Sequence, residues 1–248
     1  MSAVKAHSSY YKAGAPDWDS VEVVVVAQNK NFGDATLLIP VVSALLDLND
    51  FLEVVVYTPK AYHLLLGLDQ RVSCVDSRAT FKAFRELRSK TVGRFSVFLD
   101  FQPTLRFRVL GKLLGSEIIS GLVDSRKMIT VFDTHITRPM VPKRLRCETN
   151  LGVLRRLGCD VARNVARFKR MSNKFRSQAT IGVRAPYIVI HPGSRWMFKS
   201  LDATQWEEVI RGLQKHFDFT ILLTGGSSRQ EIELGQSLVG STGVTSLI

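Results

Sequence analysis

The sequence predicts an α/β fold in which parallel strands alternate with helices in two successive domains. Short apolar runs rich in Val and Ile recur along the chain, and segments with the helical period of apolar residues separate them. Runs that are apolar at successive positions are typical of strands buried on both faces of a parallel sheet. Strands of this kind in alternation with helices predict a doubly wound sheet.

The composition is that of an ordinary soluble globular protein with anionic partners. The chain has 248 residues, of which 45% are hydrophobic and 23% charged, enough for one large or two small domains. The net charge is +12 and the sequence pI is about 9.9. Such a balance favours nucleotide sugars, phosphorylated glycolipids, an anionic membrane face or nucleic acid, and composition does not choose among them.

Three cysteines, far apart in the sequence, form neither a CxxC motif nor a metal-ligand spacing. We therefore expect buried or incidental thiols in a reducing compartment, and no metal site. No apolar run approaches the ~18 residues of a membrane span, and the N-terminus has no signal-peptide core. These features predict a cytoplasmic protein, peripheral at most to a membrane.

Four segments are expected along the chain. Residues 1–20 are a polar lead-in, in which Asp17-Trp18-Asp19 reads as surface, and residues 21–162 form the first Rossmann-like domain. Residues 163–184 are rich in Arg and Lys and read as a solvated linker, since the aromatic residues that stack nucleic-acid bases are few there. Residues 185–248 open a second domain of the same type.

In the first domain, a buried strand is expected over residues 23–27, followed by a loop and a helix over residues 35–48. Asp34 is placed to cap that helix, and Pro40 should bend it. A lone glycine, Gly33, makes a dinucleotide-binding motif weak. Further strands are expected at residues 52–58, 72–76, 95–101 and 118–121, and helices at residues 81–90, 105–114 and 148–157.

The helix at residues 105–114 carries three cations, Arg106, Arg108 and Lys112, among apolar residues. An amphipathic helix on the sheet with solvated cations explains the pattern. Contact with acceptor phosphates or a membrane is the sharper alternative.

The second domain begins with a strand at residues 187–190 and the loop His191-Pro192-Gly193-Ser194-Arg195-Trp196-Met197-Phe198-Lys199. A helix is expected at residues 203–217, with Asp202 and Gln205 as a capping box. The strand at residues 219–223 leads to Thr224-Gly225-Gly226-Ser227-Ser228, which opens the next helix and is expected to leave its N–H groups free for a ligand. Such loops favour a phosphate or diphosphate; a basic surface loop is the plainer alternative. Glu231 is expected to meet a ribose or adenine edge, or to be an acid on the helix surface.

The HPGSRWMFK loop, with Trp206 in the next helix and the later Leu222-Leu223-Thr224-Gly225-Gly226, resembles the donor side of the lipopolysaccharide heptosyltransferases of glycosyltransferase family 9. The likeness is strongest to the branch that adds a side heptose to the inner core. The resemblance implies a GT-B fold, with two Rossmann-like domains facing a cleft. It also implies inverting transfer of heptose from ADP-heptose to the lipopolysaccharide core without a metal or other cofactor.

The resemblance also implies roles for residues. Gly33, Asp34, Leu37, Leu38 and Pro40 match the family's first loop, in which the Asp is the general base. The family has Lys or Arg at the position of Gln28, and Lys30 stands nearby with a charge. Gln102 and Arg106 match a later segment that lies near the acceptor in the family. The first loop and this segment together lead us to expect Gly33, Lys30 and Arg106 at the acceptor. Donor contacts are expected from Ser194, Arg195, Lys199, Thr224, Gly225, Gly226 and Ser227.

The family continues with an Asp-Ser/Thr-Gly-x-x-His loop that grips the donor diphosphate, and the sequence holds no such segment. We therefore expect a C-terminally truncated transferase with an incomplete second domain, inactive by itself. A non-catalytic, degenerate relative that binds glycolipid or a partner enzyme is the alternative, and a basic nucleic-acid-binding module is less favoured.

Overall fold

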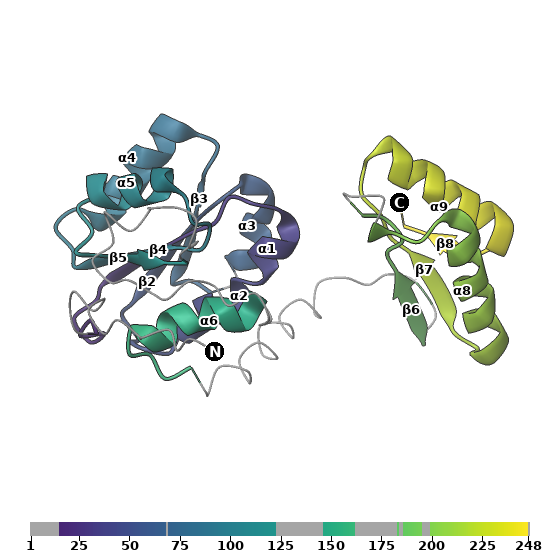
Figure 1. The fold of residues 1–248 in the computed structure, drawn as a ribbon, viewed down its shortest axis with the longest axis horizontal. Coiled ribbons are helices and arrows are strands. Elements are labelled where there is room, and N and C mark those ends of the chain that lie inside the picture. The colour runs from purple at the N-terminus through teal and green to yellow at the C-terminus, as the bar shows by residue number, and fades with distance from the viewer. Residues whose placement is uncertain are drawn as a thin grey trace, which may run out of the picture. The chain divides into compact units, whose positions relative to one another are not determined.

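A computed structural model describes residues 15–67, 69–122, 146–161, 183, 186–194 and 199–247. The chain divides into two compact units, residues 1–177 and 178–248 (Figure 1). The predicted linker, residues 163–184, lies outside the described residues except for Val183.

The first unit is built on a five-stranded parallel sheet with the order β3-β2-β1-β4-β5. All five residues of the central strand β1 are buried, because β-branched side chains fill both faces of the sheet. The strands predicted in this region are confirmed within one residue at each end. They are β1 (Val23–Ala27), β2 (Glu53–Thr58), β3 (Val72–Asp76), β4 (Ser96–Asp100) and β5 (Ile118–Gly121).

Helices cover both faces of this sheet (Figure 1). One face packs against α4 (Thr80–Thr91) and α5 (Leu105–Leu113) through Ala83, Leu87 and Phe107. The other face packs mainly against α2 and α6. The remaining bounds are α1 (Phe32–Thr36), α2 (Ile39–Leu46), η1 (Lys60–Tyr62), α3 (His63–Leu66) and α6 (Arg146–Arg156).

The continuous helix predicted over residues 35–48 is wrong. The structure has two helices, α1 and α2, separated at Leu37 and Leu38. Pro40 lies in the first turn of α2, where its missing N–H leaves no helical hydrogen bond unmade, so it starts a helix instead of bending one. The predicted capping role of Asp34 is also wrong, because α1 begins at Phe32 and Asn31 is its N-cap residue.

The cations of α5 differ from one another. Lys112 and Arg106 are exposed, as predicted, but Arg108 is completely buried. Its Nε lies 3.6 Å from Oδ2 of the equally buried Asp100, and its guanidinium donates to the carbonyls of Ser120 and Leu122. The prediction of a solvated or acceptor-facing cation is therefore wrong for Arg108. Its charge is paired inside the protein, as a buried charge requires.

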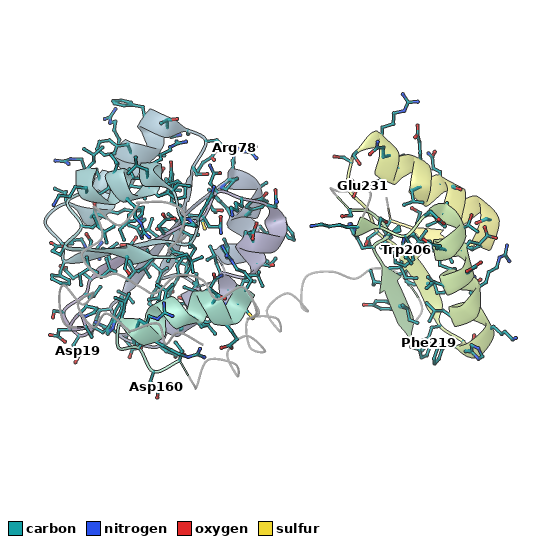
Figure 2. All side chains as sticks on the ribbon, in the orientation of Figure 1. Asp19, Arg78, Asp160, Trp206, Phe219 and Glu231 are labelled. Atoms are coloured by element: carbon teal, nitrogen blue, oxygen red, sulfur yellow. The ribbon has the colours of Figure 1, made fainter. Side chains whose placement is uncertain are left out.

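The segment before β1 is partly anchored. Asp17 and Asp19 are exposed, as the surface reading predicted, but the Trp18 indole donates a 2.7 Å hydrogen bond to the carbonyl of Leu157. Figure 2 shows Asp19 at the opposite end of the first unit from Arg78, which follows β3. Asp19 therefore lies at the amino edge of the sheet, away from the carboxyl ends of the strands where ligands bind in such folds.

The second unit has a three-stranded parallel sheet, β6-β7-β8, with its own hydrophobic core. The predicted capping box of Asp202 and Gln205 is confirmed at the start of α8. The α/β class with parallel sheets is thus confirmed for both units. The elements are β6 (Tyr187–Ile190), α8 (Ala203–His216), β7 (Thr220–Leu223), α9 (Arg229–Thr242) and β8 (Thr245–Ser246).

Candidate active site

In the first unit, the candidate residues lie on the loops and first helical turns that follow β1 and β4, at the carboxyl edge of the sheet. Asp34 is the third residue of α1 and is partly buried. Within the described part of the chain its carboxylate has no hydrogen bond or ion pair. Gly33 precedes it on the exposed surface. A carboxylate in this setting keeps its lone pairs for a ligand, which a general base needs.

Two cations flank this edge. Lys30 and Arg106 are both exposed, and they come from the β1–α1 loop and the first turn of α5. Arg106 also contacts the phenol of Tyr57, at the end of β2. Burial raises the pKa of Tyr57, and Arg106 only partly opposes that rise. The pKa is therefore above its usual value, and the phenol is protonated near neutral pH. The Tyr57 hydroxyl donates to the carbonyl of Ser77, 3.2 Å away.

The loops after β1 and β4 are joined by two glutamines. Gln28 is 1% exposed, and its Nε2 donates to the Phe101 carbonyl over 3.2 Å. In the other direction, the backbone N–H of Asn29 donates to Oε1 of Gln102 over 2.9 Å. Sequence reasoning treated Gln28 only as a missing cation and missed this role, because nothing in the local pattern names a partner 73 residues away.

In the second unit, the loops after β6 and β7 lie side by side. His191 Nδ1 is 3.2 Å from Oγ1 of Thr224, and the Thr224 N–H donates to the Ile190 carbonyl over 2.9 Å. The expectation that all N–H groups of residues 224–228 are open to a ligand is therefore wrong for Thr224, which extends the pairing of β7 with β6.

Glu231 lies between these two loops. Its side chain is 17% exposed, and its Oε2 accepts a 2.7 Å hydrogen bond from the Ser228 hydroxyl. A Cβ at Gly193 would lie 2.3 Å from Oε1, and one at Gly226 would lie 2.5 Å from Oε2. Glu231 therefore lies in the first turn of α9 as an acid that the two loops largely cover. The two glycines leave room for this carboxylate, and neither has a positive φ.

The other expected donor residues are placed on the same edge. Ser194 is partly buried, Lys199 is exposed, and Gly225, Gly226 and Ser227 precede the N-cap residue Ser228 of α9. Arg195 lies outside the described residues. The structure thus groups the described members of the predicted donor set at the carboxyl ends of β6 and β7, and the predicted acceptor residues at the carboxyl edge of the first sheet.

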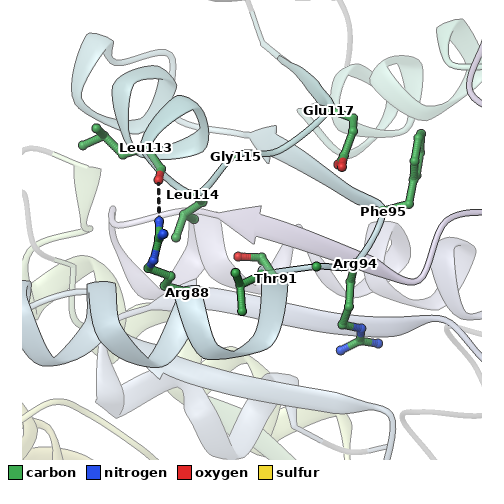
Figure 3. A pocket seen from close by; sticks show the side chains of 10 residues that line it. Arg88, Thr91, Arg94, Phe95, Leu113, Leu114, Gly115 and Glu117 are labelled. Carbon is green, nitrogen blue, oxygen red and sulfur yellow. Dashed lines mark hydrogen bonds between the residues drawn. The ribbon is translucent and has the colours of Figure 1, made fainter.

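A hollow of about 330 Å³ lies at the other edge of the first sheet (Figure 3). It is lined by the ends of α4 and α5 and by residues that precede β4 and β5. Arg88 points to the Leu113 carbonyl, 3.4 Å away, and Arg94 pairs with Glu53 at 2.8 Å. The hollow belongs to the amino edge of the sheet, so we assign it no part in the candidate site.

Neither metal ligation nor thiol chemistry is evident in the described part of the chain. Groups of three or more His, Cys, Asp or Glu that could hold a metal are absent from it. Burial raises the pKa of Cys74 to about 11 and that of Cys159 to about 12, so both thiols are protonated near neutral pH. None of the described helices is both long and apolar enough to cross a membrane.

Each unit has a parallel sheet with polar loops at the carboxyl ends of its strands. Two such units in one chain are typical of enzymes that bind nucleotides or sugars at those loops. The model of glycosyltransferase family 9 (heptosyltransferase) matches residues 80–247, and the chain belongs to this family. It is therefore a glycosyltransferase by family. No curated protein sequence matches the chain.

Solved structures show the same fold at low sequence identity. A family 9 glycosyltransferase from Veillonella parvula is 17% identical with a TM-score of 0.71, over 94% of this chain and 70% of that one. E. coli heptosyltransferase WaaC, solved with ADP-2-deoxy-2-fluoro heptose, is 14% identical with a TM-score of 0.69, over 91% and 76%. E. coli ADP-heptose lps heptosyltransferase II is 13% identical with a TM-score of 0.61, over 91% and 72%.

Proposed function

We propose that this protein is an inverting heptosyltransferase that transfers heptose from ADP-heptose to a hydroxyl group of the lipopolysaccharide inner core. Family membership supports the reaction class. The donor is proposed because WaaC was solved with ADP and with an ADP-heptose analogue. The acceptor comes from the resemblance to the heptosyltransferase branch, and the net charge of +12 suits a phosphorylated glycolipid.

The observation that carries the mechanism is the partly buried Asp34 carboxylate, which has no hydrogen-bond partner in the described part of the chain. In the proposed reaction this carboxylate takes the proton of the acceptor hydroxyl, and the hydroxyl oxygen forms a bond to the anomeric carbon of heptose. The bond from that carbon to the diphosphate breaks on the opposite face, which inverts the configuration. Lys30 and Arg106 would orient the acceptor.

The leaving ADP takes the bond's electron pair and gains negative charge. We propose that Lys199, together with Ser194, Arg195, Gly225, Gly226 and Ser227, stabilises that charge, so that no metal is required. Thr224 would contribute its hydroxyl group, since its N–H is bonded to Ile190. Glu231 would accept a hydrogen bond from a hydroxyl group of ADP-heptose at the same edge.

Asp34→Asn tests the mechanism, because it removes the basic oxygen but keeps the size of the side chain. In a chain extended at its C-terminus by the corresponding segment of a heptosyltransferase, turnover should fall by ~10²–10⁴-fold. The melting temperature should stay nearly unchanged, since Asp34 does not cap α1. Turnover at the wild-type rate would exclude Asp34 as the base.

A non-catalytic relative that binds glycolipid is the second candidate. The buried Gln28 favours it, since the family carries a cation at this position and Gln28 is bonded inside the protein instead. If the extended chain binds the glycolipid but transfers no heptose to it, this candidate is selected. We also propose that the protein is cytoplasmic and makes peripheral contact with an anionic membrane. Fractionation of cells tests this location, since a peripheral protein should leave the membrane fraction in high salt.

A further inference from the structure

We propose that Gln28 and Gln102 are positioning residues that hold the loop before Asp34 in its active position, each by a side-chain bond to the other's loop. The inference rests on the proposed role of Asp34 as the base. Gln28, which replaces the family's cation, is then an internal support and not a vestige of a lost ligand contact.

The two side chains make reciprocal bonds. Gln28 reaches from the β1–α1 loop and donates to the Phe101 carbonyl, and Gln102 reaches back from the β4–α5 loop and accepts the Asn29 N–H. Gln28 also accepts the N–H of Lys30 on its Oε1 over 3.1 Å. Two successive backbone N–H groups of the loop that leads to α1 are thus held by glutamine oxygens.

The β4–α5 loop can act as a support because it is itself fixed from within. Oδ1 of the buried Asp100 accepts the Gln102 N–H over 2.7 Å, and its Oδ2 accepts the Thr104 N–H over 3.1 Å. The buried Arg108 compensates the charge of that carboxylate. Together these contacts fix the backbone on both sides of Pro103. The position of Gln102 is therefore fixed by Asp100 at the end of β4 and by Arg108 of α5.

A fixed support matters because α1 is short. The helix that carries Asp34 has only five residues before the break at Leu37 and Leu38, so few helical hydrogen bonds of its own fix its start. Displacement of a catalytic group by about 1 Å can cost ~10²-fold in rate. The glutamine bonds supply the restraint at the end of the loop nearest β1.

Gln102 also suggests a competing role as an acceptor ligand, and the two roles use different atoms. Positioning uses Oε1, which must be the amide oxygen because its partner is a backbone N–H. Direct binding of an acceptor hydroxyl oxygen would use the NH₂ group. Gln102→Glu keeps an oxygen for Asn29 but loses the NH₂ group, and Gln102→Leu loses both.

Amide exchange measured by NMR on the 248-residue chain tests the support without requiring turnover. In Gln102→Leu the Asn29 amide should exchange about three- to tenfold faster, the scale of one hydrogen bond. In Gln102→Glu it should stay within about twofold of wild type. Equal exchange of the Asn29 amide in wild type and Gln102→Leu would overturn the proposal, whatever the fate of Asp34.

Turnover by the C-terminally extended chain tests the consequence. Gln102→Leu should lower kcat about tenfold or more and leave the KM for ADP-heptose unchanged, and Gln102→Glu should retain most of kcat. Loss of turnover in both variants would assign Gln102 to acceptor binding and overturn positioning. If Asp34→Asn retains turnover, the proposed base fails, while the exchange result still decides whether the glutamines hold the loop.

Gln28→Lys supplies the family's cation at a position that is 1% exposed. An ammonium group can donate to the Phe101 carbonyl but accepts nothing from Lys30, so exchange at the Lys30 amide should rise and kcat should fall. A kcat above that of wild type would show that the position calls for a charge, and would overturn the proposal.

Discussion

At the scale of single residues, two groups in the donor half of the candidate site already make hydrogen bonds within the protein. Thr224 gives its N–H to β6, and Glu231 is held by Ser228. Lys199 is the exposed cation that the resemblance assigns to the diphosphate. Replacing it by Met keeps most of the stem and removes the charge.

Lys199→Met should weaken ADP binding by ~1.5–3 kcal/mol, the scale of a hydrogen bond to a charged group. Isothermal titration calorimetry with ADP measures the change. Lys215→Met, on the opposite end of α8 from the loop, is the control and should leave ADP affinity unchanged. Equal ADP affinity in Lys199→Met and wild type would reject the assignment.

The contact between Gly193 and Glu231 makes a second prediction. A methyl group at Gly193 would lie 2.3 Å from the Glu231 carboxylate and must displace it. Gly193→Ala should therefore lower the free energy of unfolding by about 0.5–1 kcal/mol, since the flexible Glu231 side chain can move aside at the loss of its contacts. Because the clash needs both side chains, Gly193→Ala combined with Glu231→Ala should cost less than the sum of the two single changes. Additive costs in urea unfolding would contradict the contact.

At the scale of elements, the strands were predictable and the first helix was not. Apolar runs such as residues 23–27 identify buried strands because both faces of a parallel sheet exclude water. The helical period continues through Leu37 and Leu38, so it did not reveal the break, although Pro40 is a common signal of a helix start. Tertiary packing, which periodicity does not encode, decides such breaks.

The candidate site was predictable in its loops but not in its contacts. The positions of Asp34, Lys199 and the Thr224 loop at strand ends follow from the order of strands and helices. The bonds of Gln28 to Phe101, and of Asp100 to Arg108, join elements that are distant in sequence. A charged residue such as Arg108 is expected at the surface unless its partner is known.

The buried pair of Asp100 and Arg108 should contribute strongly to the stability of the first unit. Arg108→Met removes one partner and leaves a buried carboxylate, and it should lower the free energy of unfolding by about 3–5 kcal/mol. Lys112→Met, an exposed cation on the same helix, should change it by less than about 0.5 kcal/mol. Equal effects in chemical denaturation would show that Arg108 is not buried in solution.

At the scale of the whole molecule, the proposed chemistry is divided between two units with separate cores. The acceptor residues belong to the five-stranded unit and the donor residues to the three-stranded one. The sequence contains no Asp-Ser/Thr-Gly-x-x-His segment, the loop that the resemblance leads us to expect at the donor diphosphate. We propose that the 248 residues alone lack the full set of groups that stabilise the leaving group.

ADP-heptose turnover should therefore be undetectable with residues 1–248 and appear when a relative's segment with that motif is fused to residue 248. Amide exchange should also be faster in the short strands of the second unit than in β1 and β4, because a larger share of the first sheet is buried. Transfer at an ordinary enzymatic rate by the 248 residues would refute the proposal that they are inactive alone.

The parallel order of the first sheet also has a consequence during synthesis. β1 is central and pairs with β2 and β4, and its β4 partner, starting at Ser96, is made roughly 70 residues after β1. At ~5–20 residues per second, one edge of an all-apolar strand waits about 4–14 s for that partner. A nascent strand of this kind is prone to aggregate while it waits, so a chaperone that covers β1 during synthesis should raise the soluble yield.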